Sequence, residues 1–124
     1  MEKLNKDQLA DLFNKGTYEL NYGNPLKSIE CYKKILFIKE NNEIVLNNLA
    51  YAYFIIGDYI NSEKLILKAI DINKNNPNFY YNLGNLYKRI SKLDDGKCEW
   101  YKNQKTLIVN DNLDSILKKI TKLL

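Results

Sequence analysis

The stretch Tyr80-Tyr81-Asn82-Leu83-Gly84-Asn85-Leu86-Tyr87 decides the fold that we predict for the whole chain. Several of its large side chains, together with Gly84, recur at the spacing of one helix face. A glycine on such a face lets a second helix approach closely, and the rings beside it fill the surrounding space. The stretch therefore predicts a helix that packs tightly against a neighbour.

Two earlier stretches repeat this pattern at a constant interval of 34 residues. A small residue holds the same place in all three copies. The matching residues are Leu46, Leu49, Ala50 and Tyr53 in the middle copy and Leu12, Lys15, Gly16 and Glu19 in the first copy. A fixed period of this length is typical of stacked helical units, so we expect one unit to occur three times.

Cap and turn residues divide the chain into short helices. Asn5 and Gln8 form a capping-box pattern, and Gly23-Asn24-Pro25 ends one helix and starts the next. Gly57-Asp58 and Asn76-Pro77 repeat these signals, with Asp58 and Asn76 as expected caps. The helices expected near the C-terminus cover 77–90, 93–108 and 111–124, and the last of them is strongly amphipathic.

The excess positive charge lies in the C-terminal part of the chain. Residues 1–76 carry ten basic and ten acidic side chains, whereas residues 77–124 carry nine basic and five acidic ones. The net charge of +4 therefore belongs to the second segment. Such a segment is either a solvated basic end or a surface that attracts acidic partners or nucleic acid.

The sequence does not contain the residues that common catalytic and metal sites need. It has no histidine, which excludes His-based triads and the usual zinc sites, and no glycine-rich phosphate loop follows a strand. Cys31 and Cys98 are too few and too far apart for a disulfide framework, so we expect them to be packing residues in a reducing compartment. We therefore predict no enzyme activity, no catalytic residue, no metal and no cofactor.

Composition also bounds the location of the protein. With 45% apolar residues the chain can bury a core, yet no stretch approaches the ~18 apolar residues of a membrane span. The N-terminal residues 1–5 lack the apolar core of a signal peptide. We expect an intracellular, cytoplasmic protein that does not associate with membranes.

The repeated residues resemble the tetratricopeptide repeat (TPR) family. The family's small residue falls on Gly16, Ala50 and Gly84, and its bulky residue in the second helix of each unit falls on Tyr32, Ile66 and Trp100. The resemblance implies one domain over residues 1–124, with repeats at about 9–42, 43–76 and 77–110 and a capping helix at 111–124. It further implies an all-α fold, an α-solenoid of three antiparallel helix pairs that twists into a right-handed superhelix.

Several residues depart from the family pattern. Lys15 and Glu19 stand where an apolar residue and a tyrosine are usual, and Ser91 replaces a glycine between helices. We therefore expect the outer face of the first repeat to be wet.

The resemblance also implies a binding groove on the concave face, lined by the first helix of each repeat. The groove residues that we expect on this basis are Phe13, Asn14, Thr17, Asn47, Asn48, Tyr51, Phe54, Tyr81, Asn82, Asn85, Lys88 and Arg89. The rings among them bury a large area at a low entropy cost and often become binding hot spots.

Asparagines recur at one position of the expected groove. Asn14, Asn48 and Asn82 are equivalent in successive repeats and should form a ladder along it. A carboxamide can both donate to and accept from the backbone of an extended peptide without reading its side chains. The alternative is that these asparagines only bridge neighbouring helices.

The expected partner is a protein or peptide segment, so the chain would act as an interaction scaffold or adaptor. In some TPR domains a five-residue carboxylate clamp binds the C-terminal tails of the Hsp70 and Hsp90 chaperones. Of the corresponding residues here, only Asn48 agrees, which argues against these tails as partners. The corresponding residues are Phe13, Thr17, Asn48, Asn78 and Asn82.

Two other functions stay open. The basic C-terminal half could bind RNA or another polyanion, although a single arginine and interspersed acids disfavour nucleic acid. Alternatively, edge helices that include Leu123-Leu124 could pair with a second copy, although a monomer is favoured.

Overall fold

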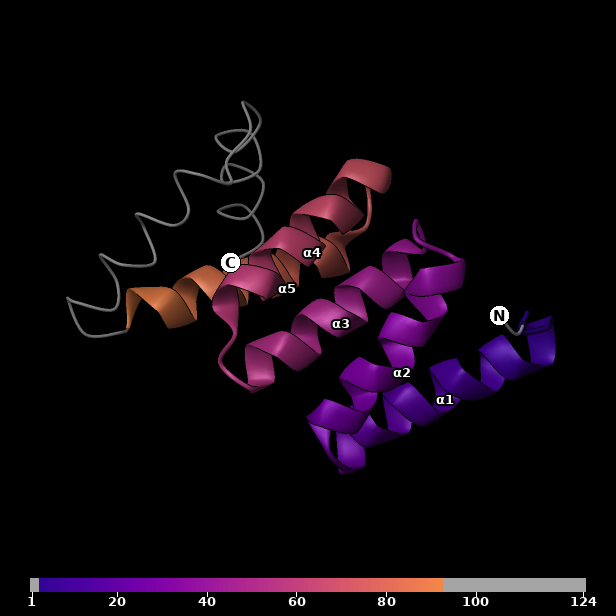
Figure 1. Cartoon of the computed structure of the whole chain (residues 1–124). Helices are drawn as coiled ribbons and strands as arrows, with labels where there is room; N and C mark the ends of the chain where they lie inside the picture. The colour runs from indigo at the N-terminus through magenta and orange to yellow at the C-terminus, as the bar shows by residue number, and fades with distance from the viewer. Residues whose placement is uncertain (1–2, 93–124) are drawn as a thin grey trace.

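The computed structural model describes residues 3–92, and every regular element in that range is an α-helix (Figure 1). The helices are α1 (Lys6–Tyr22), α2 (Pro25–Ile38), α3 (Glu43–Ile55), α4 (Tyr59–Ile72) and α5 (Pro77–Ser91). The helices expected at 93–108 and 111–124, with Cys98 and Trp100, lie outside the described residues.

Each described helix begins at a side chain that caps its first turn. The Oδ1 atom of Asn5 accepts the Gln8 N–H at 2.8 Å while the Gln8 side chain accepts the Asn5 N–H at 2.9 Å, which confirms the predicted capping box. Asn24, Asp58 and Asn76 cap α2, α4 and α5, as predicted. The fifth cap is Asn42, whose side chain accepts the Val45 N–H at the start of α3. These caps satisfy backbone donors that have no partner within the helix.

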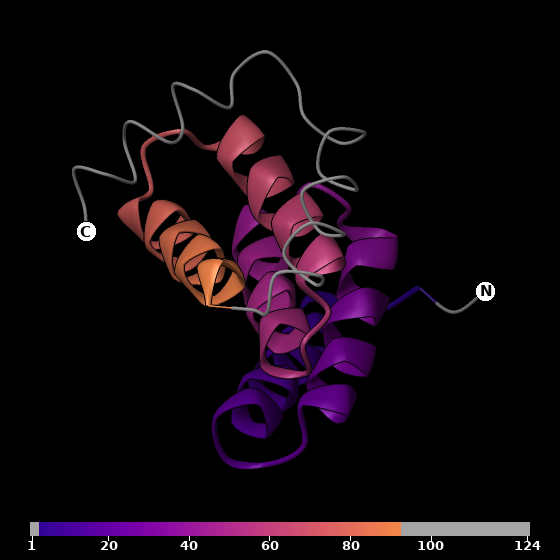
Figure 2. The ribbon, with the colours of Figure 1, turned by 90° about the vertical axis from the view of Figure 1, so that its left-hand side faces the viewer.

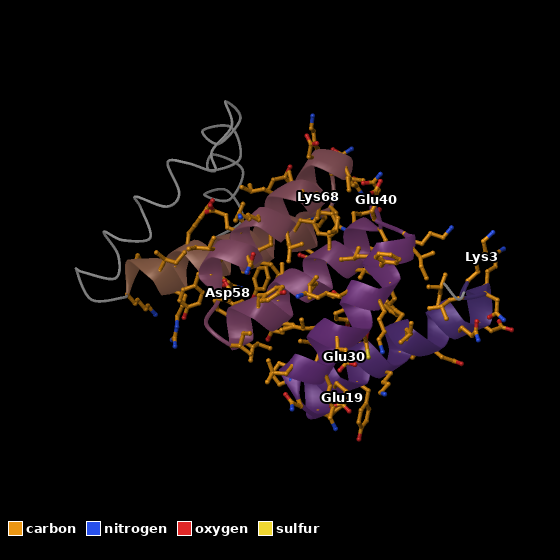
Figure 3. The ribbon with its side chains drawn as sticks, in the orientation of Figure 1. Lys3, Glu19, Glu30, Glu40, Asp58 and Lys68 are labelled. Atoms are coloured by element: carbon orange, nitrogen blue, oxygen red, sulfur yellow. The ribbon has the colours of Figure 1, made fainter. Side chains whose placement is uncertain are left out.

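Two glycines end helices in different ways. Gly57 follows α3 with a φ of 85°, and the Asp58 N–H reaches back to the Tyr53 carbonyl at 2.9 Å. This is the left-handed stop that glycine adopts without a Cβ penalty. Gly23 instead leaves room for the carboxylate of Glu19, which accepts the Asn24 N–H at 2.9 Å at the turn between α1 and α2 (Figure 3). Glu19, which departs from the family pattern, thus stabilises this turn.

The helices stack as antiparallel neighbours in two layers (Figures 1 and 2). Consecutive helices pack against each other from α1 through to α5, and α3 also contacts both α1 and α5. Among the described helices, α2 and α4 do not contact each other. The first helices of the units therefore form one inner row, α1–α3–α5. This arrangement confirms the predicted all-α stack of helix pairs.

The core follows the repeat from one unit to the next. Val45, Leu49 and Ala52 of α3 are buried and lie in a cluster with residues of α2, the preceding helix. The equivalent residues of α5, which pack on α4, are also buried. They are Phe79, Leu83 and Leu86. In α1 the same positions hold Asp11, Lys15 and Tyr18, all exposed. The prediction that Lys15 leaves the outer face of the first repeat wet is therefore confirmed.

Within each pair, a small residue faces a large one. A Cβ atom on Gly16 would lie 2.8 Å from Tyr32 Cε1 and 3.2 Å from Cys31 Cβ, so the first pair has no room for alanine. Tyr32 is fully buried and its hydroxyl is hydrogen-bonded to Thr17 Oγ1 at 2.9 Å, which limits its ability to move. The second pair has Ala50 and Ile66 at the same two positions, both buried in one cluster. Where the residue of the first helix is larger (Ala50 in place of Gly16), the residue that faces it from the second helix is smaller (Ile66 in place of Tyr32).

Equivalent buried serines differ in their partners. The Ser62 hydroxyl donates to the Ala50 carbonyl at 2.8 Å and ties α4 to α3. Ser28 holds the same position in α2 and is equally buried, but its hydroxyl has no hydrogen-bond partner. A buried hydroxyl without a partner loses its hydrogen bonds to water and regains none. The two serines should therefore have opposite effects on stability.

We expect Gly16→Ala to lower the free energy of unfolding by about 1 kcal/mol, because overpacking costs roughly 1–3 kcal/mol and the helix propensity of alanine returns about 1 kcal/mol. Adding Tyr32→Ile, which copies the second pair, should recover part of this loss. Urea unfolding of the two single variants and the double variant measures the coupling. Strict additivity would show that the two side chains do not compete for space.

Ser62→Ala should lower the free energy of unfolding by about 1 kcal/mol, the net contribution of a buried hydrogen bond. Ser28→Ala, its matched control, should leave stability unchanged or raise it by up to about 1 kcal/mol. The midpoints of urea unfolding give both values. Equal losses in the two variants would contradict the difference in bonding between α2 and α4.

Glu63 is a second polar residue that burial leaves without a partner. It is 1% exposed, and neither carboxylate oxygen has a hydrogen-bond partner. The equivalent residue of the first pair is the buried Ile29. We expect Glu63→Ile to raise the free energy of unfolding by roughly 1–3 kcal/mol, while the exposed control Glu30→Ile changes it by less than about 0.5 kcal/mol. A destabilised Glu63→Ile variant in urea unfolding would refute this prediction.

Candidate functional site

The groove residues predicted from the sequence all lie on the inner row of helices. Helix α1 carries Phe13, Asn14 and Thr17, α3 carries Asn47, Asn48, Tyr51 and Phe54, and α5 carries Tyr81, Asn82, Asn85, Lys88 and Arg89. Since α3 contacts both α1 and α5, side chains from separate repeats reach one surface. The structure divides this surface into two hollows.

The first hollow lies between α3 and α5 and has a volume of about 260 Å³. It brings together half of the predicted groove residues, with Ser62 and Ile66 of α4 and with Lys92. The predicted residues that line it are Tyr51, Phe54, Asn82, Asn85, Lys88 and Arg89. We refer to this site as the α3–α5 hollow.

Aromatic rings form one wall of the α3–α5 hollow. The rings of Tyr51 and Phe54 are stacked at 6.2 Å between centroids, one helical turn apart on α3. Phe54 also contacts the ring of Tyr59 on α4 at 5.9 Å, which holds it in place. Tyr51 remains 40% exposed, so its ring can cover an apolar group of a ligand.

The opposite wall of the α3–α5 hollow is positively charged. Lys88, Arg89 and Lys92 line it, and none of its lining residues is acidic. Arg89 Nε donates to the Tyr59 hydroxyl at 3.3 Å, a bond that orients the guanidinium across the gap between α4 and α5. Within residues 3–92 no acidic side chain lines the hollow beside these three cations, so they attract anions, and an oriented guanidinium can bind a carboxylate through two hydrogen bonds.

The second hollow lies between α1 and the start of α3, and its volume is about 770 Å³. Phe13 and Asn14 line it, as predicted for the groove. Its charged residues are of both signs, namely Lys6, Lys39, Glu40 and Glu43. We refer to this site as the α1–α3 hollow. It is less selective for the charge of a ligand than the α3–α5 hollow is.

Four predicted groove residues line neither hollow. Asn47 is only 7% exposed, and its Oδ1 atom accepts a hydrogen bond from Asn82 Nδ2 at 3.0 Å. The hydroxyl of Thr17 is bonded to Tyr32 within the first pair. Asn48 is half-buried, and Tyr81 is 57% exposed beside the hollow-lining residue Asn82.

The amide contact between repeats joins Asn82 to Asn47. The partner of Asn82 is thus the buried Asn47 and not Asn48, its equivalent in the preceding repeat. Asn14, the first member of that ladder, is exposed at the α1–α3 hollow. For Asn82 the structure thus shows an amide that bridges helices, while its side chain also lines the α3–α5 hollow.

Sequence reasoning did not place Lys92 and Tyr59 in the groove. Lys92 follows α5 as its C-cap residue, so the helical pattern of groove positions had ended before it. Tyr59 begins α4, a second-layer helix, but it lies at the junction with α3 and reaches Arg89. The one feature of the sequence that could have placed Tyr59 near the groove was its position directly after the cap Asp58, where α3 and α4 meet.

Residues 3–92 contain no cluster of three or more side chains that could hold a metal ion. Within the same range, no helix combines the length and the apolar character that crossing a bilayer requires.

Comparison with known proteins identifies the repeat. Two family models described as tetratricopeptide repeat match the chain, one over residues 45–76 and one over residues 65–97. No curated protein matches the sequence. The matched residues include α3, α4 and α5, whose packing has the small-to-large contact and the layered stacking described above. Residues 45–97 are therefore identified as tetratricopeptide repeat sequence.

Proposed function

We propose that this chain is an interaction scaffold that binds an extended, acidic segment of a protein partner along the inner row α1–α3–α5. Tetratricopeptide repeats generally mediate protein–protein interactions, and the family is typically not enzymatic. The observation that carries the proposal is the α3–α5 hollow, where a stacked ring pair faces three cations and where no described acidic residue is part of the lining.

The hollow combines the contacts that an extended peptide needs. The exposed ring of Tyr51 covers an apolar side chain of the ligand, while Lys88 and Arg89 receive a carboxylate beside it. The half-buried amide of Asn85 can donate to and accept from the ligand backbone. Affinity would thus come from the rings, and selectivity for an acidic residue from the cations.

The larger α1–α3 hollow extends this surface toward the N-terminal end of the stack. Phe13 and Asn14 repeat there the combination of a ring and an amide. Because α3 borders both hollows, one segment could contact both in succession. A repeat scaffold lengthens its binding surface in this way.

The cations of α5 also support a second candidate, the binding of RNA or another polyanion. Lys88, Arg89 and Lys92 lie together in the hollow, and the stacked rings could take bases. The other basic residues of this hypothesis, from Lys97 to Lys122, lie outside the described residues. Binding of this kind would weaken steeply with salt and would not select a peptide sequence.

We expect peptides selected from a random phage-displayed library by the full chain to carry Asp or Glu next to an apolar residue. Tyr51→Ala should weaken their binding by about tenfold or more, as for a central aromatic hot spot. Lys88→Glu combined with Arg89→Glu should remove the preference for acidic residues. Fluorescence anisotropy with the selected peptides measures each affinity.

Two control variants test whether these losses are specific to the hollow. Tyr22→Ala removes an exposed ring from α1, and Lys64→Glu with Lys68→Glu makes the same charge change on α4. Neither control should alter affinity by more than about twofold, because these residues line neither hollow. If folded Tyr51→Ala binds the selected peptides as the wild type does, the groove is not the binding site. Salt-sensitive binding of single-stranded RNA without peptide selection would support the second candidate instead.

A further inference from the structure

The N-terminal edge of the stack carries an apolar groove that contains none of the groove residues predicted from the sequence. It lies between the first turns of α1 and the last turns of α2, away from the α3–α5 hollow (Figure 1). Its volume is about 1120 Å³, larger than the 300–1,000 Å³ that is usual for small-molecule pockets. Its apolar lining consists of Leu4, Leu9, Leu12, Phe37 and Ile38. We call it the edge groove.

Phe37 shows that this apolar surface is not required by the fold. Its side chain is 70% exposed, so it contributes little to the core. The equivalent residue of the second pair is Asp71, which is also exposed. A repeat of this kind therefore folds with a carboxylate at the position, and the large exposed ring of Phe37 needs another explanation. Apolar patches of this kind commonly mark interaction sites.

Lysines surround the apolar lining of the edge groove. They are Lys3, Lys6, Lys34 and Lys39, while Asp11 is the single acidic residue among the described residues that line the groove. Figure 3 shows Lys3 at the free N-terminal end of α1. Lys34 also forms an ion pair with Glu30 at 3.5 Å, but both side chains are well exposed and the pair is weak. The groove therefore attracts negative charge to the rim of an apolar floor.

From these features, we propose that the edge groove binds an acidic amphipathic helix of a partner protein. Both walls of the groove are helices, so the groove offers no sheet edge with which an extended peptide could pair. A helical ligand satisfies its own backbone and needs only side-chain contacts. The wall formed by residues 6–12 of α1 is about 9 Å long at 1.5 Å per residue, which suits about two helical turns.

The charge pattern also decides against occupants from this chain. A second copy placed edge to edge would set four lysines against four lysines, and such like-charge contacts are costly. The amphipathic segment 111–124 carries Lys118, Lys119 and Lys122 opposite its apolar face. An acidic helix from another protein has the complementary charge. The edge groove shares Lys6, Leu9 and Lys39 with the α1–α3 hollow, but it goes beyond the proposed peptide groove, since Phe13, Asn14 and the residues of the α3–α5 hollow do not line it.

The test uses a synthetic amphipathic helix of about 18 residues, long enough to be helical in water, with Leu at i, i+3, i+4 and i+7 and Glu beside them. We expect saturable binding to the full chain, and binding at least about tenfold weaker for the same peptide with Lys in place of Glu. Phe37→Asp copies the residue of the second pair. It should weaken binding by about tenfold or more, because it removes a ring that the bound helix would cover.

The matched control is Leu26→Asp, which replaces a 60% exposed residue at the opposite end of the same helix α2. It should leave the affinity within about twofold of the wild type. Equal losses in Phe37→Asp and Leu26→Asp would overturn the proposal, as would equal binding of the Glu and Lys peptides or no saturable binding up to about 1 mM. Phosphatidylserine vesicles form the third arm, and vesicle binding that Phe37→Asp removes, without peptide binding, would assign the groove to a membrane surface instead.

Discussion

The closeness of the two helices within each pair is the constraint on which the rest of the structure depends. Because protein interiors are close-packed, the volume between two helices must be filled without overlap. Gly16 leaves room for Tyr32, whereas Ala50 leaves less room and faces Ile66. The sequence of the third unit combines a glycine and an aromatic residue again, at 84 and 100. The size of the first residue thus varies inversely with the size of the second.

Because the repeat length is constant, equivalent faces of the inner-row helices α1, α3 and α5 have equivalent positions in the stack. One face packs on the partner helix, one on the preceding unit, and one belongs to the inner row. Val45 and Phe79 hold equivalent positions and are both buried against a preceding helix, while Asp11 holds the same position in α1 and is exposed. Polar residues at this position suit a terminal unit, because the outer face of a solenoid must remain soluble. The edge groove breaks this rule with Phe37, which is why its exposure points to binding.

The two proposed surfaces share one chemistry but lie at different places in the stack. Each combines apolar contact area with lysines or arginine, and each has few acids near it. The α3–α5 hollow offers the side-chain amide of Asn85 to an extended segment, whereas the two side-chain amides of the edge groove, Asn5 and Gln8, form the capping box of α1. No residue lines both the α3–α5 hollow and the edge groove, so these two sites can be occupied at once, whereas the α1–α3 hollow shares Lys6, Leu9 and Lys39 with the edge groove.

The sequence by itself determined the helices, their caps and the layer to which each helix belongs. Capping at Asn5, Asn24 and Asp58 depends on atoms within a few residues along the chain, and the period of the apolar residues depends only on helix geometry. Only the tertiary structure decided which polar groups meet across repeats. The bonds from Asn82 to Asn47 and from Arg89 to Tyr59 join helices about one repeat apart, and a small rotation of either helix would change the partner. That rotation is set by the packing of all the neighbouring side chains together, so no local pattern in the sequence specifies it.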